Sequence, residues 1–402
     1  MYRRQGFMSL PTALDSRYRK CARSPVGAIA CRAALHLILA TSLAGLLSAQ
    51  AVWSVDEQPL TIVRAVSRDG QAVFMHAVAA VRLANGTVVV GDDHDGQLRF
   101  FDRSGQLVRK VGGLGNGPNE FRHILWMGTC GGDSISVWDF VQRRMKVVSP
   151  SGSIIRQYAV PSDTTVAAAP QVVACSRRGL LAFQSEGRPN PSETVSSPFV
   201  RGYAPVWIVD RDGRRMREAW RGPTTEMALV GRGAAPRPLG KKTSIAFSNE
   251  ELFIATADSG FLHAFSVASG SGRMVRVSSR RQRAERQDHE QAVNEVLASV
   301  HGPPPQVIDQ IRQALLGLPM PEWLVPFDQL VVDSEELLWT VTNSSNGATL
   351  LQVHGTKGEV IAQARIAGRM KIFEIGRDYV VGVKEAAEGE QQVVVLTLRR
   401  SK

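Results

Sequence analysis

The sequence predicts an all-β fold, a single six-bladed β-propeller, from three observations. A unit of four short strands recurs along the chain, and its second strand can be found six times. The last copy lacks one strand, which an unattached strand near the N-terminus can supply. Where no insertion intervenes, successive copies lie about 42–47 residues apart, a suitable length for a four-stranded propeller blade.

The clearest copy of the unit spans residues 80–111 and shows why strands are expected. Short apolar runs alternate with turns rich in Gly, Asn and Asp, such as Asn85-Gly86, and Gly supplies the positive φ that tight hairpins need. The four strands are expected at Ala80–Leu83, Thr87–Gly91, Gln97–Asp102 and Gln106–Val111.

Two features of this unit recur at regular intervals. The turn between the third and fourth strands is repeated at Phe101–Leu107, Val148–Ile154, Val209–Arg215, Ser266–Met274 and Val353–Val360. After Thr87–Gly91, the second strand is repeated at Ser134–Trp138, Leu180–Gln184, Glu251–Thr256, Glu336–Val341 and Asp378–Val383. Sheets repeated in this way bury both faces only by packing on their neighbours around an axis.

The two ends of the repeat region predict how the ring closes. The last block, Met370–Leu398, supplies three strands, at Lys371–Ile375, Tyr379–Lys384 and Gln392–Leu398. The segment Leu60–Val66 reads as a strand without a sheet of its own, so we expect it to become the fourth strand of the last blade. Two stacked β-sandwiches would also contain many short strands, but would not predict this unattached strand.

A glycine-rich stretch carries a resemblance to a known group of propellers. Gly112–Phe121 (GGLGNGPNEF) lies between the last strand of one unit and the first strand of the next. It resembles the linker of NHL-type six-bladed propellers, and secreted bacterial propellers contain similar stretches. The resemblance covers residues 60–398 by repeat pattern, implies the fold and implies no activity.

The N-terminus predicts export. A basic stretch ends at Arg32, the apolar run Ala33–Leu47 follows, and Ala49-x-Ala51 fits a signal-peptidase site. We therefore expect a signal peptide at 1–51, a mature domain at 52–402 and a periplasmic or secreted location. A retained membrane anchor is the alternative, but a run of about 15 residues is short for a bilayer span.

Charge and cysteine content narrow the classes of function. Of the net charge of +11, residues 1–51 carry +6, from seven Lys and Arg against one Asp. The +5 left on the mature domain is scattered, so no nucleic-acid partner is expected. Cys130 and Cys175 follow inner strands at equivalent positions in adjacent blades, so an oxidising compartment makes them a candidate disulfide.

Long insertions are expected on one face of the propeller, the face of the inter-blade connections and of the turns between second and third strands. They comprise Ser185–Gly202, Asn343–Ala348, Glu385–Glu390 and Arg280–Pro326. Within the last, Arg283–Val300 and Gln306–Leu318 have helical periodicity. We expect residues 280–326 to form a helical cap between blades four and five. Its apolar stripe would pack on the end of the propeller, over the face that carries Asp92–Asp95.

Two polar clusters are the candidate ligand-binding sites. Asp92, Asp93, His94 and Asp95 could bind Ca²⁺ or another divalent metal, although Asp-rich turns more often cap their own backbone. No EF-hand loop or paired-His spacing supports a metal, so no cofactor is expected. Arg280, Arg281 and Arg283 could bind an anion, but a solvated helix face with intrahelical ion pairs is the favoured interpretation.

No motif in the sequence assigns a catalytic residue. Gly112–Gly117 lacks the Lys-Ser/Thr of a phosphate-binding loop, and no Ser or Cys stands in a nucleophile elbow. Trp126, Trp138, Trp207 and Trp339 lie in or beside strands and are expected in the core. The leading hypothesis is therefore a scaffold that binds a protein or small-molecule ligand on the capped face. The alternative is an enzyme similar to metal-dependent propeller lyases or lactonases.

Overall fold

The computed structural model describes one folded unit of the chain. A second unit, 1–50, is described only at its last residue, so residues 1–49 of the predicted signal peptide (1–51) lie outside the described part, and its last residue, Ala51, begins the first strand. The description covers residues 50–62, 74, 76–160, 170–185, 187–189, 197–231, 233–277, 282–298, 304–344, 347–385 and 391–401.

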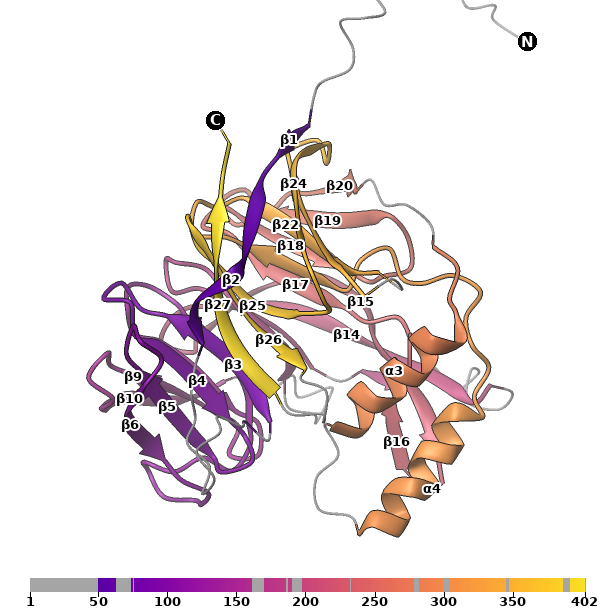
Figure 1. Cartoon of the computed structure of the whole chain (residues 1–402), viewed down its shortest axis with the longest axis horizontal. Coiled ribbons are helices and arrows are strands. Elements are labelled where there is room, and N and C mark those ends of the chain that lie inside the picture. The colour runs from indigo at the N-terminus through magenta and orange to yellow at the C-terminus, as the bar shows by residue number, and fades with distance from the viewer. Residues whose placement is uncertain are drawn as a thin grey trace, which may run out of the picture. The chain divides into compact units, whose positions relative to one another are not determined.

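The first two sheets follow the predicted four-strand unit (Figure 1). They contain β3 (Ala77–Arg82), β4 (Val88–Asp92), β5 (Gln97–Phe101), β6 (Leu107–Gly112), β7 (Ile124–Thr129), β8 (Ile135–Asp139), β9 (Arg144–Val148) and β10 (Ile154–Ala159), each sheet in the order of the sequence. The second strands β4 and β8 are buried throughout, because sheets pack on both of their faces. The outer strand β10 instead alternates half-buried and exposed residues, as expected of an edge.

The third sheet is larger than the repeat predicted. It contains β11 (Pro170–Cys175), β12 (Leu181–Ser185), β13 (Arg188–Pro189), β14 (Phe199–Val209), β15 (Arg215–Val230) and β16 (Gly233–Pro236). The expected loop insertion Ser185–Gly202 is therefore wrong in part, because Phe199–Gly202 belongs to β14 and pairs with β15. The long β14 and β15 continue past the sheet as a ribbon, and β16 joins its end.

The fourth and fifth sheets return to the regular unit. They contain β17 (Ser244–Phe247), β18 (Glu251–Ala255), β19 (Phe261–Ser266), β20 (Gly272–Arg276), β21 (Gln329–Val332), β22 (Leu338–Asn343), β23 (Thr349–His354) and β24 (Val360–Ile366). The hairpins that recur in the sequence have the expected backbone, with φ of 75° at Gly270 and 88° at Gly358. Positive φ at these positions is why the repeated turn keeps its Gly.

The last sheet is completed by the N-terminal segment. It contains β25 (Lys371–Ile375), β26 (Tyr379–Glu385), β27 (Gln391–Arg399) and β2 (Ser54–Ile62), which lies antiparallel beside β27 (Figure 1). The prediction that an N-terminal strand completes this sheet is confirmed. Its bounds were misplaced, because the strand begins at Ser54 rather than Leu60, and residues 63–66 lie outside the described part. Ahead of it, the short β1 (Ala51–Val52) pairs with β24 of the fifth sheet.

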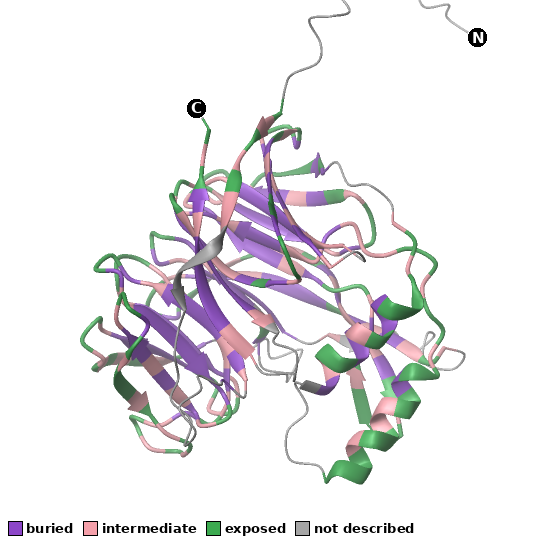
Figure 2. Ribbon diagram, in the orientation of Figure 1, coloured by how far each residue is buried: buried purple, intermediate pink, exposed green. Residues whose placement is uncertain are grey.

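The core consists of separate layers between neighbouring sheets. Six of the buried clusters each join one sheet to the next, including one between the last sheet and the first. The first strands also contact each other in a closed series, β3 to β7, β11, β17, β21, β25 and back to β3. Buried residues accordingly follow the strands through the interior of the unit (Figure 2). This arrangement of sheets around an axis is that of a β-propeller.

Two helices lie between β20 and β21, as the change of period predicted. α3 (Arg286–Ala298) and α4 (Pro305–Leu316) start with local signals that the sequence contains. The Asp288 carboxylate accepts a hydrogen bond from the Glu285 backbone N–H at 2.9 Å, and Pro305 occupies the first helical position. Backbone hydrogen bonds between 282–284 and 322–324 hold the two ends of the insertion side by side.

The surface beneath these helices differs from the prediction. The apolar stripe, with Val293, Leu297 and Leu315 buried, packs around Ala228 of β15 and not on the end of the propeller (Figure 1). The reason is the ribbon of β14 and β15, which offers an apolar surface closer to the helices. Neither helix is long and apolar enough to cross a membrane, within the residues described.

Candidate functional site

The Asp-rich turn at 92–95 is engaged in contacts with its own and the next sheet. Arg99 lies 2.9 Å from the Asp92 carboxylate and also pairs with Asp95. The His94 backbone N–H donates to Asp92 at 3.1 Å. Burial raises the pKa of Asp92, and the nearby Arg99 opposes that shift. These contacts match the alternative considered for this sequence, in which the turn stabilises its own backbone.

Asp93 connects the first sheet to the second. Its carboxylate accepts the Ile124 backbone N–H at 2.6 Å and lies 2.7 Å from Nδ1 of His123. Burial works to raise the pKa of Asp93, but the hydrogen bond with His123 and the nearby His76, 3.8 Å away, outweigh it and hold the pKa far below its usual range. The hydrogen bond with Asp93 in turn raises the pKa of His123.

The Asp93–His123 pair predicts a pH-dependent part of the stability. Because the folded pKa of His123 is raised, its contribution is complete below the unfolded pKa of about 6.5 and is lost as pH rises through the folded pKa. We expect His123→Gln to cost about 1 kcal/mol at pH 5.5, since His123 is partly exposed, and less at pH 8.5. Urea unfolding of both proteins at the two pH values measures this, and an equal cost at both would contradict it.

The predicted arginine cluster is not brought together with the Asp-rich turn. Arg280 and Arg281 lie outside the described residues. Arg283 is exposed, lies 3.8 Å from Glu322, and places its guanidinium 5.4 Å from the centre of the Trp323 ring. Arg286 pairs with Glu290 one turn further along α3, at 2.9 Å, which is the intrahelical pairing considered as the alternative.

Cys130 and Cys175 are joined by a disulfide, with their Cα atoms 5.5 Å apart. Cys130 follows β7 and Cys175 ends β11, so the bond links the first strands of the second and third sheets. Cys175 also lines the central cavity. The bond therefore ties together two of the strands that form the cavity wall.

A cavity of about 1000 Å³ lies between the first strands of the six described sheets. Each of β3, β7, β11, β17, β21 and β25 contributes residues to its wall. Apolar side chains line much of the wall, among them Trp126, Ile245 and Phe373. Polar and charged side chains line nearly as much of the wall, and a concave site of this size can hold a small molecule.

Charged side chains gather at the end of the cavity where the first strands begin. His76, Lys242, Asp328 and Arg369 all precede or lead into a first strand, and Lys371 is the first residue of β25. His76 also lies 3.8 Å from Asp93, so the Asp-rich turn borders this end through one side chain. From the insertion, α3 adds Gln291 and Glu295 to the lining.

A β-bulge in β25 explains why this strand contributes so many lining residues. The pairing with β26 shifts register between Ile372 and Glu374. A regular strand would turn alternate residues away from the cavity, whereas the bulge lets Lys371, Phe373 and Glu374 all line it. Bulges that redirect side chains in this way are common next to functional sites.

The cavity wall changes the titration of two β25 side chains. Lys371 is exposed at the cavity, and partial desolvation by the surrounding wall, with repulsion from Lys242, lowers the pKa of Lys371. Burial raises the pKa of Glu374. The Glu374 carboxyl accepts hydrogen bonds from the Arg82 backbone N–H at 2.7 Å and from the Tyr379 hydroxyl at 2.8 Å.

This cavity was not predicted from the sequence. Trp138 and Trp339 are fully buried, as predicted, whereas Trp126 and Trp207 are half-buried against the core between the second and third sheets, and Trp126 also lines the cavity. A signal for the cavity was present in the sequence: the charged residues Lys242, Asp328 and Lys371 stand at or just before the start of a first strand. Among the described residues, no group of three or more His, Cys, Asp or Glu is placed to hold a metal ion.

Several solved structures share this fold at low sequence identity. A candidate exported protein from Bacteroides fragilis is 12% identical, with a TM-score of 0.47, and the match covers 89% of this chain and 98% of that chain. Virginiamycin B lyase from Staphylococcus aureus is 9% identical (TM-score 0.42; 88% and 96% covered). A gluconolactonase from Xanthomonas campestris is 13% identical (TM-score 0.41; 86% and 97% covered).

No protein-family model and no curated protein matches the chain. The likenesses to solved structures are too distant to transfer an activity, a substrate or a site residue. The β-propeller assignment therefore depends on the strand order and on the ring of contacts within this chain.

Proposed function

We propose that this protein is an exported six-bladed β-propeller that binds a small molecule in its central cavity. The observation that carries the proposal is the cavity itself, walled by the first strands of the described sheets and charged at one end. The sequence predicted a ligand surface on the helical cap and the Asp-rich turn; we now propose that the ligand binds in this interior cavity instead. A scaffold role is favoured over catalysis, and no metal cofactor is proposed.

Six blades account for the contacts along the ring. Each described sheet shares a buried cluster with the next, and β2 completes the sheet that β25 begins. Because β2 comes from the start of the domain and β27 from its end, their pairing closes the ring. The Gly-rich linker fits this scheme: it folds compactly, with the Gly117 N–H donating to the Glu120 carboxylate at 2.7 Å and Phe121 fully buried.

Blocking the cavity tests the proposed function. Thr129 ends β7, is half-buried and lines the cavity, so Thr129→Trp would fill part of it, whereas Thr129→Ser would leave the space open. We expect native mass spectrometry of protein isolated from its own host to show a bound small molecule in the wild type and in T129S. In T129W the bound fraction should fall at least tenfold.

Two outcomes would overturn the proposal: a wild-type protein without a bound molecule, or equal occupancy in T129W. Metal analysis of the same samples tests the alternative hypothesis, the metal-dependent lyase or lactonase. Stoichiometric metal that resists dialysis would favour that enzyme over the scaffold.

Export is tested separately, by determining the N-terminus of the mature protein. The expected signal-peptidase site places the mature N-terminus at Val52, and N-terminal sequencing of protein from the native host should begin at or near it. Cleavage there retains Trp53, whose backbone N–H donates to the carbonyl of Gln363 in β24 at 2.8 Å. An intact N-terminus on protein from the cytoplasm would contradict export.

A further inference from the structure

The charges around the cavity are not balanced. Among the described lining residues, the basic side chains other than His76 are Lys242, Arg369, Lys371 and Lys384, and the acidic ones are Glu295, Asp328 and Glu374. Two of the three acids are engaged elsewhere. Asp328 accepts the Asn343 backbone N–H at 2.7 Å, and Glu374 accepts hydrogen bonds from Arg82 and Tyr379. A carboxyl whose pKa is raised, as that of Glu374 is, also carries less negative charge.

The remaining acid, Glu295 of α3, is paired with Arg369. The Arg369 guanidinium lies 3.1 Å from the Glu295 carboxylate, and both side chains are partly exposed. Lys242, Lys371 and Lys384 line the same cavity without an ion pair to any described residue, and Lys242 and Lys371 lie at the end where the first strands begin. Repulsion from Lys242 contributes to the lowered pKa of Lys371, and Glu295 acts on Lys371 in the opposite direction.

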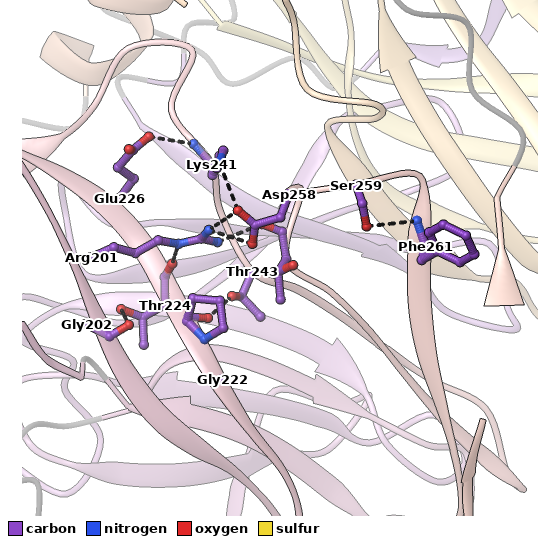
Figure 3. Close-up of polar contacts among 12 residues, drawn as sticks. Arg201, Gly202, Gly222, Thr224, Glu226, Lys241, Thr243, Asp258, Ser259 and Phe261 are labelled. Carbon is purple, nitrogen blue, oxygen red and sulfur yellow. Dashed lines mark hydrogen bonds and ion pairs between the residues drawn. The ribbon is translucent and has the colours of Figure 1, made fainter. Parts of the chain in front are cut away.

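The backbone around Lys242 is anchored on both sides (Figure 3). The Lys241 ammonium lies 3.0 Å from the Asp258 carboxylate, and Nη1 of Arg201 donates to both oxygens of that carboxylate at 2.8 Å. On the other side, the Thr243 hydroxyl donates to the Pro223 carbonyl at 2.5 Å. Lys242 is therefore presented to the cavity from a segment held by the ribbon of β14 and β15 and by the turn after β18.

We infer that the cavity takes an organic anion: its charged group sits between Lys242 and Lys371, and its apolar body lies against Trp126 and Phe373. This inference rests on the proposed function and names the chemical class of its ligand. A carboxylate, sulfonate or phosphate would supply the negative charge that these lysines lack. Glu295 supplies part of that charge in the free protein and so competes with the ligand.

A pair of fluorescent probes separates charge from apolar binding. 8-Anilinonaphthalene-1-sulfonate and N-phenyl-1-naphthylamine share their ring systems, and only the first carries an anionic group. We expect both to bind the wild type and both to bind T129W more weakly, because the indole would fill the end of the cavity opposite the lysines. Lys371→Met should weaken binding of the sulfonate about tenfold, the value of one charge-assisted contact, and leave binding of the neutral amine unchanged.

Matched variants show that the effect belongs to this site. Lys371→Arg keeps the charge and should restore sulfonate binding to within about threefold of the wild type, since the geometry of the cation differs. Lys357→Met removes an exposed lysine in the turn between β23 and β24, outside the cavity lining, and should change the binding of neither probe. Glu295→Gln removes the competing charge and should tighten sulfonate binding several-fold.

The outcomes distinguish the two proposals. Suppose that T129W weakens binding of both probes but K371M does not change binding of the sulfonate. The cavity then binds ligands, and the inferred anion site is wrong. If K357M weakens binding of the sulfonate probe as much as K371M does, the effect comes from the net charge of the protein, and the inferred anion site is again wrong. If neither probe binds in a T129W-sensitive way, the proposed function fails as well.

Discussion

Replacing Arg400 by alanine is expected to lower the free energy of unfolding by about 3–5 kcal/mol, the cost of leaving a buried charge without its partner. The Arg400 guanidinium lies 2.8 Å from the Asp333 carboxylate, whose side chain has no exposed surface. The same carboxylate accepts a hydrogen bond from the Trp339 indole at 2.8 Å. Arg400 also lies over the ring of Trp53, 5.0 Å from its centre. One side chain near the C-terminus thus joins the N-terminal segment to the fifth sheet.

Arg399 is the matched control for this experiment. It pairs with Asp56 at 2.8 Å, but its side chain is 69% exposed and solvent screens the pair, so Arg399→Ala should cost far less than Arg400→Ala. Urea unfolding of the three proteins, followed by tryptophan fluorescence, measures the difference. If Arg400→Ala and Arg399→Ala cost the same, Arg400 would not hold the two ends of the domain together.

Removing the disulfide should cost about 4 kcal/mol by the loop-entropy model. Cys130 and Cys175 are 45 residues apart, and a cross-link over that separation restricts the unfolded chain by about that amount. The double variant Cys130→Ser/Cys175→Ser should therefore unfold at lower urea concentration than the wild type. In a reducing agent, the wild type should lose nearly the same stability and approach the variant.

Thiol titration provides the direct check on the bond. The mature protein, unfolded without reductant, should show no reactive thiol, because Cys130 and Cys175 are the two cysteines left after residue 51. Two reactive thiols, or a wild type whose stability is unaffected by reductant, would contradict the prediction.

Local sequence signals predicted most of the strands and turns. The second strands expected at Leu180–Gln184 and Glu251–Thr256 are observed at Leu181–Ser185 and Glu251–Ala255. They were predictable because a strand with sheets on both faces must be continuously apolar. The repeated hairpin was predictable because its Gly needs a positive φ.

The ribbon of β14 and β15 could not be predicted in the same way. Its sequence, which includes Gly202, Gly222 and Pro223, reads as a loop because Gly and Pro are poor strand formers. The pairing of two long strands with each other, and the cover that α3 and α4 give to Ala228, stabilise it nonetheless. The surface beneath the helices was misassigned for this reason.

The candidate site was the least predictable part of the molecule. Lys242 and Lys371 are 129 positions apart in the sequence, and nothing in either neighbourhood indicates the other. A local cluster such as Asp92–Asp95 is conspicuous in a sequence, yet its carboxylates are occupied by Arg99, His123 and backbone N–H groups.

The sequence by itself determined the β-repeat, the hairpins, the two helices and the strand that completes the last sheet, because each depends on residues within one turn, strand or helix. The tertiary structure alone decided which side chains meet. Closing the sheets into a ring brings the starts of their first strands to one end of a cavity, whose wall both Lys242 and Lys371 line. A bulge in β25 then turns consecutive side chains toward it. Contacts between residues so far apart arise from packing around the axis, and no local pattern records them.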